Sequence, residues 1–134
     1  MYDIVIVGGG AAGFSAAEAA RQHSPDARIL LIQSEAVLPY DRTRLSKELV
    51  SGVSSEKLLL AHESWYEEQK IDLMLDTEVS EIDRSSHVVR VNGDDGDGGD
   101  DIGEQLEYRK LVLATGAKPL FPPVVRPHKE DSFY

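Results

Sequence analysis

The sequence of 134 residues has no cysteine, a single tryptophan and no long apolar run. Without cysteine, the chain has no disulfide, thiolate metal ligand or thiol nucleophile. No stretch approaches the roughly 20 apolar residues that a membrane-spanning helix needs. Asp3 stands where a secretory signal would be basic, and Glu18 interrupts the following apolar run. We therefore expect no membrane span and a cytoplasmic location.

Positive charge is also scarce. The sequence has 14 Lys and Arg residues against 24 Asp and Glu residues, which gives a formal net charge of −10. Such a surface repels a phosphate backbone, so no nucleic-acid partner is expected. The four histidines are scattered and none has metal-ligand spacing, so no metal site is expected.

The order of apolar runs and helix formers predicts an α/β fold. Buried strands are expected at residues 2–7, 28–33 and 71–75, and helices at 11–23, 42–50 and 63–69. The first strand, helix and strand span about 30 residues, the length of one parallel crossover unit. Alternating residues at 78–82, 87–92 and 105–109 predict a small antiparallel meander, and 110–115 a fourth parallel strand.

An Asp- and Gly-rich run at residues 93–101 separates the last two meander strands. It could suggest calcium, but the sixth position counted from Asp95 is Asp100, where a calcium loop needs glycine. A solvated hairpin insertion is the better interpretation. After Gly116 the sequence is rich in proline, and irregular structure is expected there.

The strongest local motif is the G-x-G-x-x-G of residues 8–13, which follows a strand and opens a helix. Gly8 would allow the tight turn, Gly10 the close approach of a pyrophosphate, and Gly13 the packing of helix on sheet. Together with Ala11 and Ala12, Gly13 would begin the helix and offer free backbone N–H groups to phosphates. This site does not depend on the net charge of the protein. The alternative is a glycine-rich turn without a ligand.

A Rossmann unit usually ends with an acid that binds a ribose hydroxyl. Here the last strand residue is Gln33, and the acid Glu35 follows in the loop. Ser34 and Glu35 are the best candidates for the ribose contacts. The alternative for Glu35 is an ordinary solvated carboxylate.

Three stretches together resemble one protein family: VIVGGGAAG at residues 5–13, LPYDRTRLSK at 38–47 and LVLATGAKP at 111–119. The chain resembles the N-terminal, FAD-binding part of the pyridine nucleotide-disulfide oxidoreductase superfamily. Within that superfamily, the chain looks like the ferredoxin and rubredoxin reductases, the flavin half of nitrite reductase and the apoptosis-inducing factors. Their usual P-Y-D-R-P-P-L-S-K is altered here, with Thr43 and Arg44 replacing the Pro-Pro pair.

The resemblance implies an FAD site. In relatives, the arginine matching Arg42 contacts FAD, and the lysine matching Lys47 lies beside the flavin ring, where a cation would stabilise reduced flavin. We take Lys47 as the candidate catalytic residue; the alternative for both is an exposed basic helix. The backbone at Val79 would lie against the adenine, which is compatible with a core valine.

The A-T-G stretch, Ala114, Thr115 and Gly116, ends the fourth parallel strand. Ligands bind beyond the carboxyl ends of parallel strands, so we expect it to face the glycine motif. Disulfide reductases and thiol peroxidases of this superfamily carry cysteines that this chain lacks. The resemblance therefore implies electron transfer from NAD(P)H through FAD to a non-thiol acceptor: a redox protein, a metal centre or a quinone.

The resemblance also implies an incomplete flavin domain. Residues 1–118 would be its N-terminal portion, with the meander at about 78–109, and 119–134 the crossover into a missing NAD(P)H-binding domain. Relatives add a further strand and an interface domain, or the partner could be a second chain. We expect residues 111–114 to form an unprotected edge, FAD to bind weakly, and the edge to pair in a homodimer or with a partner segment.

Two other functions stay open. One is a non-catalytic nucleotide-binding or interaction module left by truncation. The other is a single-Rossmann enzyme that uses NAD(P), although the sequence offers no suitable catalytic set and this interpretation leaves residues 38–47 unexplained.

Overall fold

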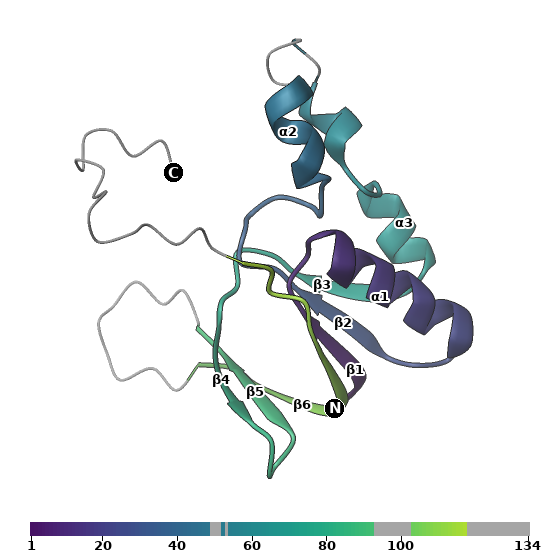
Figure 1. The fold of residues 1–134 in the computed structure, drawn as a ribbon. Helices are drawn as coiled ribbons and strands as arrows, with labels where there is room; N and C mark the ends of the chain where they lie inside the picture. Colours follow the sequence, from purple (N-terminus) through teal and green to yellow (C-terminus); the bar gives the residue numbers. More distant parts are fainter. Residues whose placement is uncertain (49–51, 53, 93–102, 118–134) are drawn as a thin grey trace, which may run out of the picture.

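The computed structural model describes residues 1–48, 52, 54–92 and 103–117. They form one six-stranded sheet in the order β3-β2-β1-β6-β5-β4, with helices α1 and α3 beside its parallel strands (Figure 1). The elements are β1 (Tyr2–Val7), α1 (Ala11–His23), β2 (Ile29–Ile32), α2 (Arg42–Glu48), η1 (Ser55–Leu58), α3 (Glu63–Glu68), β3 (Ile71–Met74), β4 (Val79–Asp83), β5 (Val88–Val91) and β6 (Gln105–Leu113). The predicted α/β class, with its parallel sheet and antiparallel meander, is confirmed.

Side chains of β1 and β2 point alternately to two hydrophobic cores. Ile6, Ile29 and Leu31 pack with Ala17 of α1 and Tyr66 of α3. The other face contributes Val5, Val7, Leu30 and Ile32, which pack with apolar residues of β5 and β6. The helices and the meander therefore cover opposite faces of the same two strands, which explains why both strands consist of continuous apolar runs.

One long strand replaces the two that the sequence predicts at 105–109 and 110–115. Strand β6 runs without a break from Gln105 to Leu113. Its first part pairs antiparallel with β5, and from Tyr108 onward it pairs parallel with β1. The predicted boundary falls inside an exposed charged pair, Arg109 and Lys110. This pair interrupts the apolar pattern but includes no glycine or proline, so the backbone hydrogen bonding of β6 continues through it.

Other boundaries shift by a few residues. The prediction of a buried strand at 71–75 is wrong in its burial: only Ile71 of β3 is buried, because β3 is the edge of the sheet and pairs only with β2 among the described residues. The short 3-10 helix η1 was not predicted. The insertion at 93–101 lies outside the described residues, which resume at Gly103, and so does the segment 119–134.

The far end of β6 has one neighbour in the described part of the chain. Residues 110–113 pair with β1, while β5 reaches only Gln105 to Glu107. Leu113 is 62% exposed. Homodimer formation along this edge stays a prediction.

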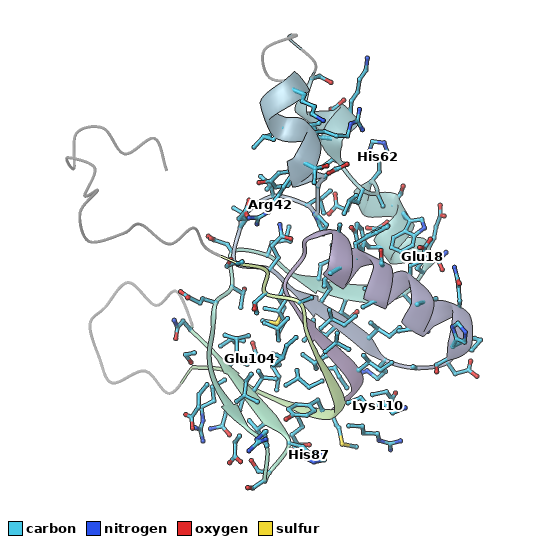
Figure 2. All side chains as sticks on the ribbon, viewed as in Figure 1. Glu18, Arg42, His62, His87, Glu104 and Lys110 are labelled. Atoms are coloured by element: carbon cyan, nitrogen blue, oxygen red, sulfur yellow. The ribbon has the colours of Figure 1, made fainter. Side chains whose placement is uncertain are left out.

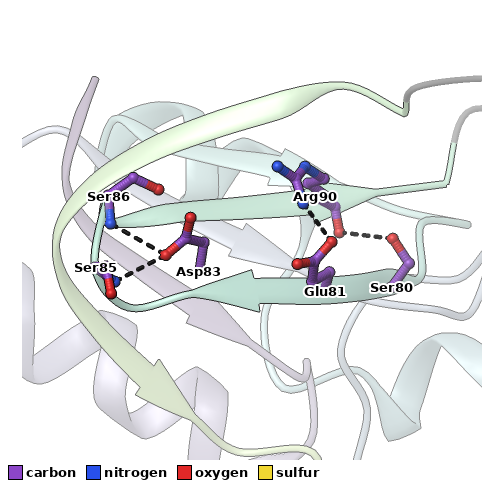
Figure 3. Close-up of polar contacts among 6 residues, drawn as sticks. All are labelled: Ser80, Glu81, Asp83, Ser85, Ser86 and Arg90. Carbon is purple, nitrogen blue, oxygen red and sulfur yellow. Dashed lines mark hydrogen bonds and ion pairs between the residues drawn. The ribbon is translucent and has the colours of Figure 1, made fainter.

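Polar contacts fix the meander hairpin (Figure 3). The Asp83 carboxylate accepts the backbone N–H groups of Ser85, at 2.8 Å, and of Ser86, at 3.1 Å. The hydrogen bond from the Ser86 side chain, followed by these N–H groups, lowers the pKa of Asp83. On the strands, Arg90 forms an ion pair with Glu81.

Candidate functional site: a cleft at the carboxyl ends of the parallel strands

A cleft of about 360 Å³ opens where β1, β2 and β6 end. Parallel strands present their carboxyl ends at one edge, which is where ligands of open α/β sheets bind. The cleft is lined by Val7, Gly8, Gly9, Gly10, Ile32, Gln33, Ser34, Arg42, Thr77, Glu78, Val79, Ala114, Thr115, Gly116 and Ala117.

Two glycines of the motif are required by close backbone contacts. Gly8 has a φ of +110°, and a Cβ added to it would lie 2.2 Å from the carbonyl oxygen of Ala114. A Cβ on Gly13 would lie 1.8 Å from the carbonyl oxygen of Gly8. The chain therefore turns tightly out of β1, and α1 packs directly on that turn.

Gly10 differs from both. A Cβ added there would meet nothing within 4 Å, although Gly10 lines the cleft. Gly10 is the N-cap of α1, and its carbonyl accepts the N–H of Phe14 at 2.9 Å. The first turn of α1 carries no acidic side chain, so the positive end of the helix dipole is not neutralised there. Protein packing gives no reason for glycine at position 10, whereas a ligand pressed against the backbone would.

The segment from β2 to the start of α2 brings a positively charged side chain to the cleft. Arg42 lies at the start of α2 (Figure 2). It lines the cleft and forms an ion pair with Glu35. The Tyr40 hydroxyl donates to the same carboxylate at 3.0 Å, and the Arg42 guanidinium lies 5.7 Å from the centre of the Tyr40 ring. Burial, then the hydrogen bond to Glu35, raises the pKa of Tyr40. Glu35 therefore holds Arg42 at the cleft and is more than a solvated loop carboxylate.

The remaining walls come from the ends of β4 and β6. Val79 opens β4, with Thr77 and Glu78 just before it. The A-T-G stretch follows β6, and the N–H of Ala114 donates to the Val7 carbonyl at 2.8 Å. This hydrogen bond joins the ends of β6 and β1 directly beside the glycine turn.

The structure brings together most of the residues that the sequence singles out. Those lining the cleft are Gly8, Gly10, Ser34, Arg42, Val79, Ala114, Thr115 and Gly116. Ala11, Ala12 and Gly13 lie in the first turn of α1, and Glu35 lies behind Arg42. Lys47 is exposed on α2 and does not line the cleft.

Sequence reasoning missed two contributors of special interest, Gln33 and Gly9. Gln33 lines the cleft and is 4% exposed, although it stands where an acid was sought. Gly9 lies in the motif at a position that its pattern leaves free. The signal in the sequence was that Gln33, a polar residue, directly follows the apolar run of β2.

Comparison with known proteins decides the family. A family model described as pyridine nucleotide-disulphide oxidoreductase matches residues 2–132. The chain belongs to this family. Within the described residues, no helix is long and apolar enough to cross a membrane.

Individual members of the pyridine nucleotide-disulphide oxidoreductase family are similar along most of the chain. The ferredoxin–NAD(+) reductase component of an anthranilate 1,2-dioxygenase system from Burkholderia cepacia is 41% identical over 115 residues, covering 85% of this chain and 26% of that protein. The NADH:rubredoxin oxidoreductase structure from Clostridium acetobutylicum superposes with a TM-score of 0.75 at 33% identity, covering 91% of this chain and 30% of that one.

A third relative was solved with its partner. The reductase chain of a covalent putidaredoxin reductase–putidaredoxin complex gives a TM-score of 0.79 at 33% identity, covering 92% of this chain and 28% of that one. The chain thus spans about a quarter to a third of the length of these relatives.

Proposed function

We propose that the cleft binds FAD, and that the chain is the FAD-binding part of an NAD(P)H-dependent oxidoreductase. The observation that carries the proposal is the glycine turn. Gly8 and Gly13 are glycine because backbone atoms crowd them, whereas Gly10 faces open cleft at the start of a helix. This is the arrangement that admits a pyrophosphate against the backbone.

The surrounding residues fit the other parts of FAD. The N–H groups of Ala11, Ala12 and Gly13, in the first turn of α1, would complete the phosphate site. Ser34 is exposed at the cleft and would face the ribose hydroxyls, while Arg42, held by Glu35, would supply positive charge. The backbone of Val79 would meet the adenine, and Ala114, Thr115 and Gly116 would line the cleft beside the glycine turn. When bound, the flavin would take up hydride from a nicotinamide and release electrons onward.

We propose a redox protein as the acceptor of those electrons. The relatives' names support this, because they specify reductases of ferredoxin and rubredoxin and a complex with putidaredoxin. The absence of cysteine from the sequence supports it as well, since this chain offers no thiol to the flavin.

Lys47 is proposed to act on the flavin through its charge, although it lies outside the lining of the cleft. In the flavin-loaded protein, Lys47→Ala is expected to lower the flavin potential, because a nearby cation stabilises the reduced form. Lys57→Ala, on η1, is the matched control. A potential that stays constant or rises in Lys47→Ala would assign Lys47 to the protein surface.

Ligand titration tests the proposed function most simply. Equilibrium dialysis of the chain against FAD, NAD+ and FMN should show binding of FAD ahead of the other two. Bound FAD also gives a visible flavin spectrum, which NAD+ lacks. Preferential binding of NAD+ would favour a single-Rossmann NAD(P) enzyme, and binding of none of the three would contradict the assignment of the cleft.

A further inference from the structure

Gln33 is the only buried side chain of polar or charged type among the described residues apart from the tyrosines in the two cores. It directly follows β2, whose four residues are all buried and apolar. A buried amide is costly unless its donors and acceptors are satisfied. Its contacts therefore indicate why a polar residue is kept at this position.

The contacts of Gln33 join three segments at the cleft. Its side-chain N–H donates to the carbonyl of Val37, which closes the chain into a turn that contains Ser34 and Glu35. Its backbone N–H donates to the Met74 carbonyl at 2.8 Å, and its carbonyl accepts the N–H of Thr77 at 3.0 Å. Gln33 thus connects β2 with the end of β3 and with the segment leading to Val79.

The side chain also fits against the glycine turn. A Cβ added to Gly9 would lie 1.6 Å from Oε1 of Gln33 and 2.6 Å from its Cδ. The amide therefore occupies the space that any side chain at position 9 would need. Glycine at position 9 and glutamine at position 33 form a matched pair, which joins the glycine turn to the turn at residues 33–37.

We propose that Gln33 is a positioning residue for the adenosine half of the dinucleotide, an inference that rests on the proposed function of the cleft. Its hydrogen bond to Val37 sets the turn that presents Ser34 at the cleft and places Glu35 beside Arg42. Gly9 is glycine so that the Gln33 amide can lie against the phosphate-binding turn. Gln33 thus orders the turn at residues 33–37, which would contact the ribose, without contacting the ribose itself.

The variant Gln33→Met tests whether Gln33 acts through its hydrogen bond to Val37 or only through the volume that it fills. Methionine has nearly the same length and volume but no N–H donor. Val37 is 50% exposed, so water can solvate its carbonyl once the turn loosens. We expect the affinities for FAD and for ADP, a probe of the adenosine half, to fall about tenfold, or about 1.4 kcal/mol. The urea midpoint should change little.

The matched pair is tested by a double-mutant cycle of Gly9→Ala and Gln33→Ala. In Gly9→Ala the new Cβ displaces the amide and breaks its bond to Val37, so ADP affinity should fall about tenfold. In the Gln33→Ala background that bond is already absent, so Gly9→Ala should cost no further affinity. Ser80→Ala, outside the cleft lining, is the control and should bind ADP as the wild type does.

The outcomes separate this inference from the proposed function. FAD and ADP affinities of Gln33→Met equal to those of the wild type would overturn the positioning role and leave the FAD site intact. Additive losses in the cycle, or a loss of urea midpoint in step with affinity, would show that Gln33 only fills the core. A wild-type chain that binds neither FAD nor ADP overturns both proposals, whereas measured coupling together with an unchanged midpoint supports both.

Discussion

Two walls of the cleft differ in composition, one being formed by backbone and the other by side chains. The glycine wall, residues 8–13, is backbone: Gly8 and Gly13 are fixed by carbonyl oxygens, and Gly10 is bare. The loop wall, residues 33–42, is side chain: Gln33 binds Val37, and Glu35 holds Tyr40 and Arg42. At Gly8 and Gly13 the backbone wall leaves no room for added atoms, whereas the side-chain wall depends on pairs of residues that can be exchanged together. Substitutions in the first should therefore be more damaging than substitutions in the second.

The largest effect is expected for Gly13→Val. Its side chain would begin 1.8 Å from the Gly8 carbonyl oxygen, and a backbone atom held between β1 and α1 cannot move aside cheaply. We expect the free energy of unfolding to fall by about 3 kcal/mol or more, measured by urea denaturation. Ala19→Val, at an exposed position of the same helix, is the matched control and should change it little. Equal stability of the two variants would mean that α1 does not pack on the turn as described.

A smaller effect is expected for Arg42→Ala in the loop wall. The Arg42 side chain is 62% exposed, so its ion pair with Glu35 contributes only about 0–1 kcal/mol to stability. Affinity for FAD should nevertheless fall about tenfold, because the variant removes the positive charge and leaves the Glu35 carboxylate beside the cleft. Isothermal titration at low salt would measure it, with Arg84→Ala in the meander hairpin as the control. Equal affinity in Arg42→Ala and the control would remove Arg42 from the site.

The smallest effect is expected away from both walls, at Asp83. Its lowered pKa means that the carboxylate stabilises the hairpin above the pKa of the unfolded chain and loses this effect as the pH falls. Asp83→Asn should therefore lower the thermal midpoint slightly at pH 7, and the difference from wild type should shrink on acidification below about pH 4. FAD affinity should not change. A difference that grows on acidification would contradict this sign.

The contrast between the walls also explains what the sequence could predict. The glycine wall follows a spacing rule that depends on backbone sterics, so the roles of Gly8 and Gly13 could be predicted from the motif and its place between a strand and a helix. The role of Gly10 against a ligand stays a prediction. The loop wall depends on which side chains meet after folding. The pairing of Glu35 with Arg42, and of Gln33 with Gly9, joins residues whose spacing carries no pattern. The sequence suggested a ribose contact at Glu35, which stays a prediction, but it gave no sign that this carboxylate also pairs with Arg42.

The sheet shows the same division. The β1–α1–β2 unit was predictable because its apolar runs are continuous and flanked by glycine and proline. The continuity of β6 was not, since Arg109 and Lys110 are exposed where the strand passes from one pairing partner to the other. Local polarity alone does not distinguish such a crossing point from a strand end.

FAD affinity of Gly10→Val tests the central claim most directly, that FAD lies against the bare backbone of Gly10. Because a Cβ at this position meets nothing within 4 Å, the chain should fold with little change in its urea midpoint. FAD affinity should fall by at least about tenfold, because the valine occupies the space of the pyrophosphate. The control Ala19→Val should bind as the wild type does. Unchanged FAD affinity in a folded Gly10→Val protein would contradict the account.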